Sequence, residues 1–231
     1  MKRLVLLPGM DGTGELFYEF MRMIPEPKHI QALHYPTGAS PSYQQLLAMV
    51  QTMVPESGPY FLLAESYSTP LAIEFAATNP PNLKGLILCA GFAASPLTGP
   101  MRFLASLLAP LLFYLPIPSA ASELFLIGPD APPSLQTSVR AAISSVKPGV
   151  MAARLRAVLR CDMRQDLRKV AIPLLYIQAT RDKLISPSCL EEIRSIRPQV
   201  RVAQVDGPHL MLQREPKQSA DAVARFIHEL H

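Results

Sequence analysis

Ser66, Asp182 and His209 stand in this order along the chain, each shortly after a short run of apolar residues. A histidine can take the proton of a serine hydroxyl, and a carboxylate can hold the imidazole in the tautomer that does so. The serine oxygen can then attack an acyl carbon and carry the acyl group for a time. These residue types therefore predict acyl transfer through a covalent intermediate.

Ser66 lies where an apolar run passes directly into a helical pattern, in the sequence Ala64-Glu65-Ser66-Tyr67-Ser68. A strand-to-helix turn of this kind presents a nucleophilic hydroxyl above a sheet, and the usual pattern is G-x-S-x-G. Ala64 and Ser68 replace the two glycines but are still small, so the steric requirement is met. On this motif alone, a serine that only caps the following helix is the alternative.

Asp182 and His209 each follow the carboxyl end of an expected strand, where ligands bind in open α/β sheets. Asp182 could instead be a turn residue, and His209 a loop histidine bound to backbone. Asp206 is a second candidate acid, and His34 competes with His209 because it also ends a strand. The chain order Ser, Asp, His is that of the α/β-hydrolases, which favours Ser66 as nucleophile, His209 as base and Asp182 as acid.

The segment Leu7–Gly14 carries three glycines in six residues, which permit close backbone approach and positive φ angles. A plain strand–helix turn is one alternative. A phosphate-binding loop is a weaker one, because the spacing G-x-x-x-x-G-K-S/T is missing. As an oxyanion loop, it would pair the N–H of Met10 with the N–H of Tyr67, the residue after the serine.

Short apolar runs alternate with helical patterns along most of the chain, which predicts an α/β fold with a doubly wound, mainly parallel sheet of about six strands. The expected strands are Leu4–Leu7, Ile30–Leu33, Tyr60–Leu63, Gly85–Cys89, Leu174–Gln178 and Val200–Val205. The expected helices include Tyr43–Val54, begun by Ser40-Pro41, and Ser66–Thr78, Pro187–Ile196 and Pro216–Leu230.

Residues 92–147 interrupt this alternation with prolines and helix-like pieces, so we expect a helical cap inserted into a single domain of residues 1–231. Charged residues are almost absent between Phe103 and Ala121, which favours an apolar acyl group as ligand. The predicted substrate-binding residues are Phe103, Leu104, Leu107 and Leu108. An ordinary core helix is the alternative for this segment.

The formal net charge is +4, with basic residues spread along the chain among acidic ones, so we expect no nucleic-acid partner. Three cysteines without a C-x-x-C pair predict no disulfide framework and a reducing compartment. The apolar run near Met1 is too short for a signal peptide, so a cytoplasmic protein is expected. The stretch Phe103 to Ile117 is too short for a bilayer, which needs about 20 residues, and membrane contact is not expected.

Four arginines recur every four residues, at Arg156, Arg160, Arg164 and Arg168. A solvent-exposed stripe that breaks near Cys161 is the favoured interpretation. A weak contact with an anionic surface is the alternative.

Taken together, Leu7–Gly14, Ala64–Ser68, Asp182 and Gly207–His209 resemble the α/β-hydrolase superfamily over nearly the whole chain. The loop L-P-G-x-D-G-T-G is similar to hydrolases of the esterase and lysophospholipase type and to phytyl-ester-synthase-like acyltransferases. Departures are the two replaced glycines, Pro8 where many members carry a histidine, and a start at what is usually the third strand.

The resemblance implies a serine carboxylic-ester hydrolase that needs neither a metal nor an organic cofactor. Its partner would be a small-molecule ester with an apolar acyl group. A serine rather than an aspartate at position 66 disfavours dehalogenase and epoxide-hydrolase chemistry. An acyltransferase, a thioesterase and a ligand-binding homologue with an unused triad remain alternatives on the same fold.

Overall fold

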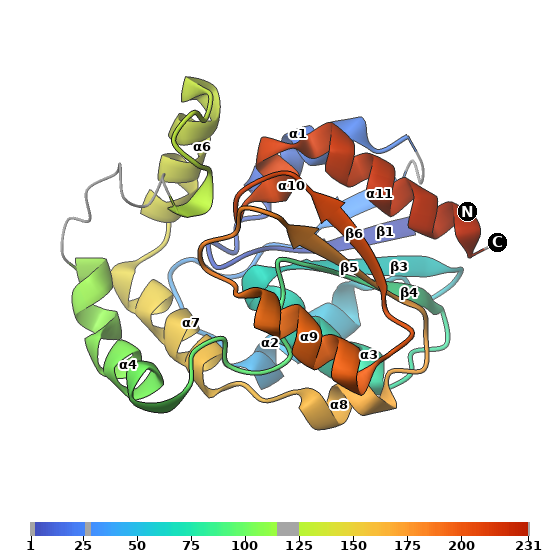
Figure 1. Cartoon of the computed structure of the whole chain (residues 1–231), viewed down its shortest axis with the longest axis horizontal. Coiled ribbons are helices and arrows are strands. Elements are labelled where there is room, and N and C mark those ends of the chain that lie inside the picture. The colour runs from blue at the N-terminus through green and yellow to red at the C-terminus, as the bar shows by residue number, and fades with distance from the viewer. Residues whose placement is uncertain (1–2, 26–28, 115–124, 231) are drawn as a thin grey trace.

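A parallel sheet forms the centre of the molecule in the computed structural model, which describes residues 3–25, 29–114 and 125–230. The strands are β1 (Arg3–Leu7), β2 (His29–Ala32), β3 (Tyr60–Glu65), β4 (Leu83–Cys89), β5 (Leu174–Ala179) and β6 (Arg201–Val205). They lie in the order β2-β1-β3-β4-β5-β6, and every neighbouring pair is parallel (Figure 1). The doubly wound fold and all six expected strands are confirmed.

Helices cover both faces of the sheet and bury two separate apolar clusters against it (Figure 1). One face carries α1 (Tyr18–Met23), α10 (Met211–Arg214) and α11 (Pro216–Glu229). The other carries α2 (Tyr43–Met53), α3 (Thr69–Ala77), α8 (Arg164–Lys169) and α9 (Pro187–Ile196). All six residues of β3 are buried, as expected for a central parallel strand, which has no solvent-exposed face.

Helix α2 starts at Tyr43 as expected, but its N-cap is Ser42 rather than Ser40. The hydroxyl of Ser42 accepts the N–H of Gln45 at 3.3 Å, and the Gln45 side chain accepts the N–H of Ser42 at 2.8 Å. This reciprocal capping box satisfies two backbone donors at once. Ser42 is therefore the cap because a glutamine stands three residues after it.

Helices α4 (Gly99–Tyr114), α6 (Pro133–Ser144) and α7 (Pro148–Arg160) lie beyond the carboxyl ends of the strands, between β4 and β5 in the chain (Figure 1). The two ends of this excursion are joined: Ala94 bridges Asp162, and the Ser95 N–H donates to the Cys161 carbonyl at 3.1 Å. Helix α7, which follows the expected end of the cap at Lys147, also packs against α4.

No helix in the described ranges is long and apolar enough to cross a bilayer. Helix α4 contains the apolar stretch expected from Phe103 to Ile117 as far as Tyr114, and the last three residues lie outside the described ranges. The three cysteines are buried and free.

Candidate active site

Ser66 forms the turn between β3 and α3 and has a positive φ of 46°, which is uncommon for a residue other than glycine. The turn is held from Ser68, whose buried hydroxyl donates to the Pro8 carbonyl at 2.5 Å and lies 2.8 Å from the Tyr35 hydroxyl. Ala64 is also fully buried. Small side chains thus occupy the two positions where the usual motif has glycine. One of these residues, Ser68, ties the turn to the loop after β1.

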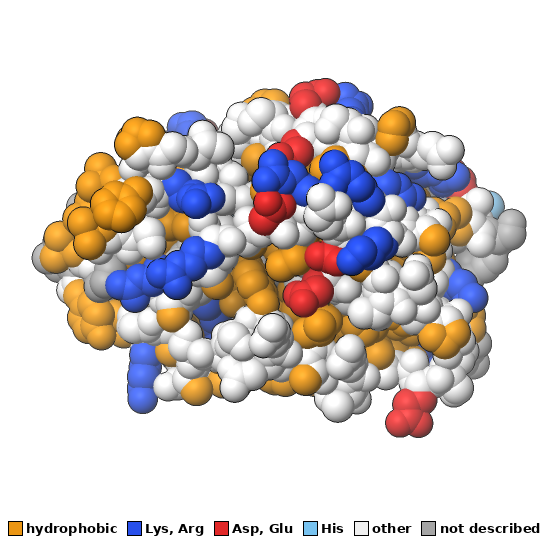
Figure 2. Space-filling model, turned by 90° about the horizontal axis from the view of Figure 1, so that it is seen from below, with side chains coloured by type: hydrophobic (Ala, Val, Ile, Leu, Met, Phe, Trp, Pro, Cys, Tyr) orange, Lys and Arg blue, Asp and Glu red, His pale blue; other side chains and the backbone are white. Residues whose placement is uncertain are grey.

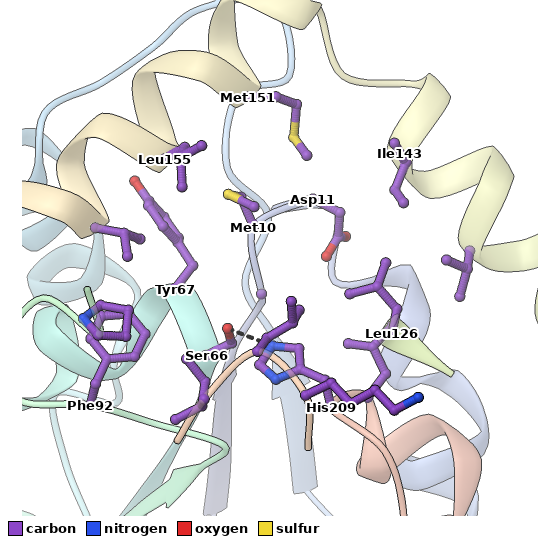
Figure 3. A pocket seen from close by; sticks show the side chains of 18 of the residues that line it. Met10, Asp11, Ser66, Tyr67, Phe92, Leu126, Ile143, Met151, Leu155 and His209 are labelled. Carbon is purple, nitrogen blue, oxygen red and sulfur yellow. Dashed lines mark hydrogen bonds between the residues drawn. The ribbon is translucent and has the colours of Figure 1, made fainter. Parts of the chain in front are cut away.

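A chain of hydrogen bonds links Ser66, His209 and Asp182. The Nε2 atom of His209 lies 2.9 Å from the Ser66 Oγ atom (Figure 3), and its Nδ1 atom lies 2.8 Å from Asp182 Oδ2. The other Asp182 oxygen accepts the N–H groups of Leu184 and Ile185 at 2.8 and 3.0 Å. An ionised carboxylate can accept all three bonds, so this geometry can orient an imidazole toward a serine hydroxyl.

The two competing residues lie elsewhere. Asp206 is exposed and accepts hydrogen bonds from the Thr180 hydroxyl at 2.8 Å and the Arg181 guanidinium at 3.0 Å. His34 is exposed near Gly14 and does not line the cavity that contains Ser66. The structure therefore brings Asp182 and His209, and neither competitor, to the serine.

The loops after β1 and β3 face each other where the strand order reverses, because β2 lies on one side of β1 and β3 on the other. This reversal is where α/β sheets bind ligands. Met10 and Tyr67 both line the cavity beside Ser66 (Figure 3). The Tyr67 carbonyl accepts the Tyr43 hydroxyl at 3.0 Å, which fixes the peptide between Tyr67 and Ser68, next to the one that carries the Tyr67 N–H.

Arg154 on α7 reaches this loop and is 1% exposed. Its guanidinium donates to the carbonyls of Met10 and Asp11, both at 2.8 Å, and to the Pro36 carbonyl at 2.9 Å. A Cβ atom at Gly12, where φ is +71°, would lie only 2.6 Å from the guanidinium. The glycine thus admits the arginine, which holds the backbone of the expected oxyanion loop by its carbonyl groups.

We expect Arg154→Met to lower kcat about tenfold to a hundredfold with a smaller change in KM, because a displaced oxyanion donor weakens only the transition state. The carbonyls of Met10, Asp11 and Pro36 would also lose this donor, so thermal stability should fall. Steady-state kinetics and thermal melting measure both effects. Arg156→Met, two residues along the same helix, is the control, and equal losses in the two variants would contradict a role for Arg154 in positioning.

A cavity of about 450 Å³ opens over Ser66 and His209 and is walled by α4, α6, α7 and the loops after β1, β4 and β5. Its described lining is apolar except for a few groups, among them Asp11, Lys183, Ser66 and His209. The apolar lining residues include Leu16, Phe92, Phe113, Leu126, Ile143, Met151, Leu155, Val158 and Leu210 (Figure 3). Such a space suits an apolar group bound next to the serine.

The four residues predicted to bind substrate are not among those that line this cavity. Phe103, Leu104, Leu107 and Leu108 are 44% to 74% exposed on the outer side of α4. The helix instead turns Phe113 toward the cavity. The expectation differs from the structure because α4 is apolar around most of its circumference, so its sequence does not reveal which side faces inward.

Glu65 is buried directly before the serine and is 2% exposed. One carboxyl oxygen accepts the Gln213 amide at 3.2 Å, while the other, like the Gln213 carbonyl oxygen, has no partner within the described part of the chain. Burial, and secondarily Asp11, raises the pKa of Glu65 to about 8. At neutral pH this side chain is therefore held as a neutral acid behind the turn.

The raised pKa of Glu65 predicts a pH-dependent loss of stability. Between its ordinary value of 4.5 and about 8, only the unfolded chain releases the proton, so the stabilisation present at low pH is lost as the pH rises. Over this range, the parent should lose up to about 1.4 kcal/mol per pH unit relative to Glu65→Gln. Urea unfolding at a series of pH values tests this. When the free energy of unfolding is plotted against pH, the Glu56→Gln control should run parallel to the parent. If the Glu65→Gln curve also runs parallel to the parent, Glu65 is not a neutral acid in the folded protein.

Arg154 and the cavity residues of α6 and α7 were not found from the sequence. Met151, Leu155 and Val158 do recur at helical spacing, which indicates one apolar side of α7 but not what that side contacts. Nothing in the pattern distinguishes Arg154 from the arginines around it. Within the described ranges, no group of histidine, cysteine, aspartate or glutamate side chains could hold a metal ion.

Comparison with known protein families gives a match over most of the chain. Residues 41–197, more than half of the chain, match the family described as serine aminopeptidase, S33. No curated protein sequence matches significantly.

Solved structures share the fold at low sequence identity. A lipase-esterase related protein from Clostridium acetobutylicum is 16% identical, with a TM-score of 0.79 over 97% of this chain and 94% of its own. An enol-lactonase from Burkholderia xenovorans is 16% identical, with a TM-score of 0.75 over 99% and 90% of the two chains. A bromoperoxidase from Bacillus anthracis is 15% identical, with a TM-score of 0.80 over 98% and 92%.

Proposed function

Because the chain belongs to the serine aminopeptidase S33 family of α/β-hydrolases, and is thus a hydrolytic enzyme, we propose that it hydrolyses carboxylic esters through an acyl-enzyme on Ser66. The observation that carries this proposal is the hydrogen-bond chain from Ser66 Oγ through His209 to Asp182. Ester hydrolysis by this route uses only side chains, backbone N–H groups and water.

In the proposed reaction, His209 Nε2 takes the Ser66 proton while the serine oxygen attacks the acyl carbon. The N–H groups of Met10 and Tyr67 bind the carbonyl oxygen as it becomes negative. The proton passes from His209 to the leaving alcohol as the ester bond breaks. Water then attacks the acyl-enzyme, again losing its proton to His209, and the free acid leaves. Asp182 remains ionised and holds the imidazole throughout.

The apolar cavity supports an acyl group of medium length as the part of the substrate that is recognised. We propose that α4, α6 and α7 form the cap that selects it. An aminopeptidase would also have to bind a protonated amino group. Asp11 is the one carboxylate among the described lining residues, and its Oδ2 atom already accepts the N–H and the hydroxyl of Thr13 at 2.9 and 2.6 Å. This favours the ester over the peptide.

A matched substrate panel tests the proposal. Nitrophenyl esters from acetate to decanoate should be turned over, with medium chains preferred, while aminoacyl nitroanilides should not. Acyl thioesters, and esters offered together with a long-chain alcohol, distinguish a thioesterase and an acyltransferase from an esterase. Nitroanilide turnover without ester turnover would contradict the proposal, and no turnover of any of these would favour a ligand-binding protein.

Narrowing the cavity should change the preferred acyl length. Leu155→Trp fills space beside Ser66, so hydrolysis of the decanoate ester should fall about tenfold or more while that of the acetate ester changes little. The same replacement at Leu107, on the outer side of α4, should leave the order of preference unchanged. The kcat/KM values over the ester panel measure this. If Leu107→Trp shifts the preference and Leu155→Trp does not, the acyl group binds along α4 as the sequence predicts.

A further inference from the structure

Helix α4 exposes an unusual number of large apolar side chains. Seven of them are 44% to 74% exposed: Met101, Phe103, Leu104, Leu107, Leu108, Leu111 and Tyr114. Figure 2 shows the hydrophobic side chains gathered at the end of the molecule formed by α4. Isolated exposed apolar residues are ordinary, but a contiguous group of this kind marks a surface that binds something.

These side chains share one side of the helix, which we call the outer face of α4. They recur every three or four residues along a helix about 24 Å long. The opposite side packs on α7, where Ala109 is buried and Ser106 accepts the Arg156 guanidinium at 3.4 Å. Packing within the described part of the chain therefore buries the inner side of α4, and the outer face stays exposed.

The part of the chain that contains this face carries an excess of positive charge. The excursion of residues 95–161 contains six basic and two acidic residues, so it accounts for the whole formal net charge of +4. Arg102 is exposed in the first turn of α4, and Arg156 and Arg160 are on α7, which packs against α4. The helices α4, α6 and α7 contain no acidic residue. Positive charge is thus in excess in this segment, whereas basic and acidic residues balance in the rest of the chain.

We propose that the outer face of α4 docks on an anionic lipid bilayer. A helix with apolar side chains on one side and arginines nearby can lie in a membrane interface, where lipid tails take up the apolar side chains and anionic headgroups attract the arginines. A second copy of the chain would bring the same positive region against itself, which disfavours self-association. The docked helix would separate the bilayer from the cavity by about 10 Å, because Phe113 on its other side lines the cavity.

This inference reverses the expectation that membrane contact is absent, and it does not depend on the ester chemistry. It is tested by sedimentation of the full chain with vesicles of phosphatidylcholine, alone or mixed equally with phosphatidylglycerol. The parent and Ser66→Ala should both bind the mixed vesicles and bind the neutral ones more weakly. Added salt should weaken binding to the mixed vesicles.

Two pairs of variants identify the surface. Met101→Gln with Leu111→Gln keeps charge and helix propensity and should weaken binding about tenfold or more. Arg102→Gln with Arg156→Gln should weaken it about fivefold for each arginine. The controls are Tyr18→Gln with Met23→Gln, and Arg22→Gln with Arg225→Gln, which change exposed residues of α1 and α11 and should bind as the parent does. Each variant is checked for folding by thermal melting and by turnover of a water-soluble ester.

Binding that is absent, or equal in all variants, would overturn the proposal. A dimer that light scattering detects and that Met101→Gln with Leu111→Gln dissociates would also overturn it, because the outer face would then join two copies of the chain. Loss of ester turnover with intact vesicle binding would contradict the proposed function and leave the docking surface standing.

Discussion

Replacing Ser66 with alanine should lower kcat for ester hydrolysis about a millionfold while the protein stays folded, since the loss of one member disables a triad that acts as a unit. The Ser66 hydroxyl has His209 as its hydrogen-bond partner, and it lies on the cavity side of the turn, so its removal leaves the packing of β3 and α3 in place. Ester kinetics and covalent labelling by a fluorophosphonate measure the loss, and thermal melting confirms the fold.

Ser68→Ala is the matched control for this prediction. Ser68 lies in the same turn but is fully buried, and its hydroxyl bonds to the Pro8 carbonyl and the Tyr35 hydroxyl. The variant should lose stability and still be labelled by the fluorophosphonate. Full ester turnover in Ser66→Ala, or labelling that disappears only in Ser68→Ala, would show that Ser66 is not the nucleophile.

Asp182→Asn should lower kcat about ten-thousandfold, because an amide that donates to His209 Nδ1 favours the tautomer that cannot accept the serine proton. The change conserves shape, and the remaining amide oxygen can still accept the N–H groups of Leu184 and Ile185, so the loop after β5 should keep its conformation. The loss should appear in kcat more than in KM, since ground-state binding in the cavity is unchanged.

Asp206→Asn is the control that separates the two candidate acids. Its carboxylate is exposed and bonds to Thr180 and Arg181 rather than to the histidine, so ester turnover should remain within about twofold of the parent. The reverse result, a normal rate in Asp182→Asn and a large loss in Asp206→Asn, would assign the acid to Asp206. Loss in both variants would indicate that the whole loop region is needed for folding of the site.

The strand pattern and the site residues at strand ends were predictable from the sequence because both depend on local chemistry. A parallel strand covered on both faces must be apolar throughout, and β3 is buried at every position. The turn that follows it requires small residues two positions before and two positions after Ser66, and Ala64 and Ser68 meet that need. Parallel strands all end at one edge of a sheet, so residues that follow strands gather there whatever the details of packing.

The choice between candidate residues needed the tertiary structure. Asp182 and Asp206 both follow strands, and only the path of the loop after β5 decides that Asp182 meets His209. The role of Arg154 depends on an approach between α7 and a loop 144 residues earlier in the chain, which no local pattern encodes. Arg154 differs from Arg156 and Arg160 on the same helix because it is buried and they are not.

Helix α4 illustrates the same division. By itself, the sequence determined that this segment is helical, apolar and nearly free of charge, because those properties belong to its own residues. Which side would face α7 and the cavity was decided only when α7 packed against it and took up the inner side, including Ala109 and Phe113. A helix that is apolar around most of its surface has no preferred side until a neighbour is placed, and that placement left the outer face exposed.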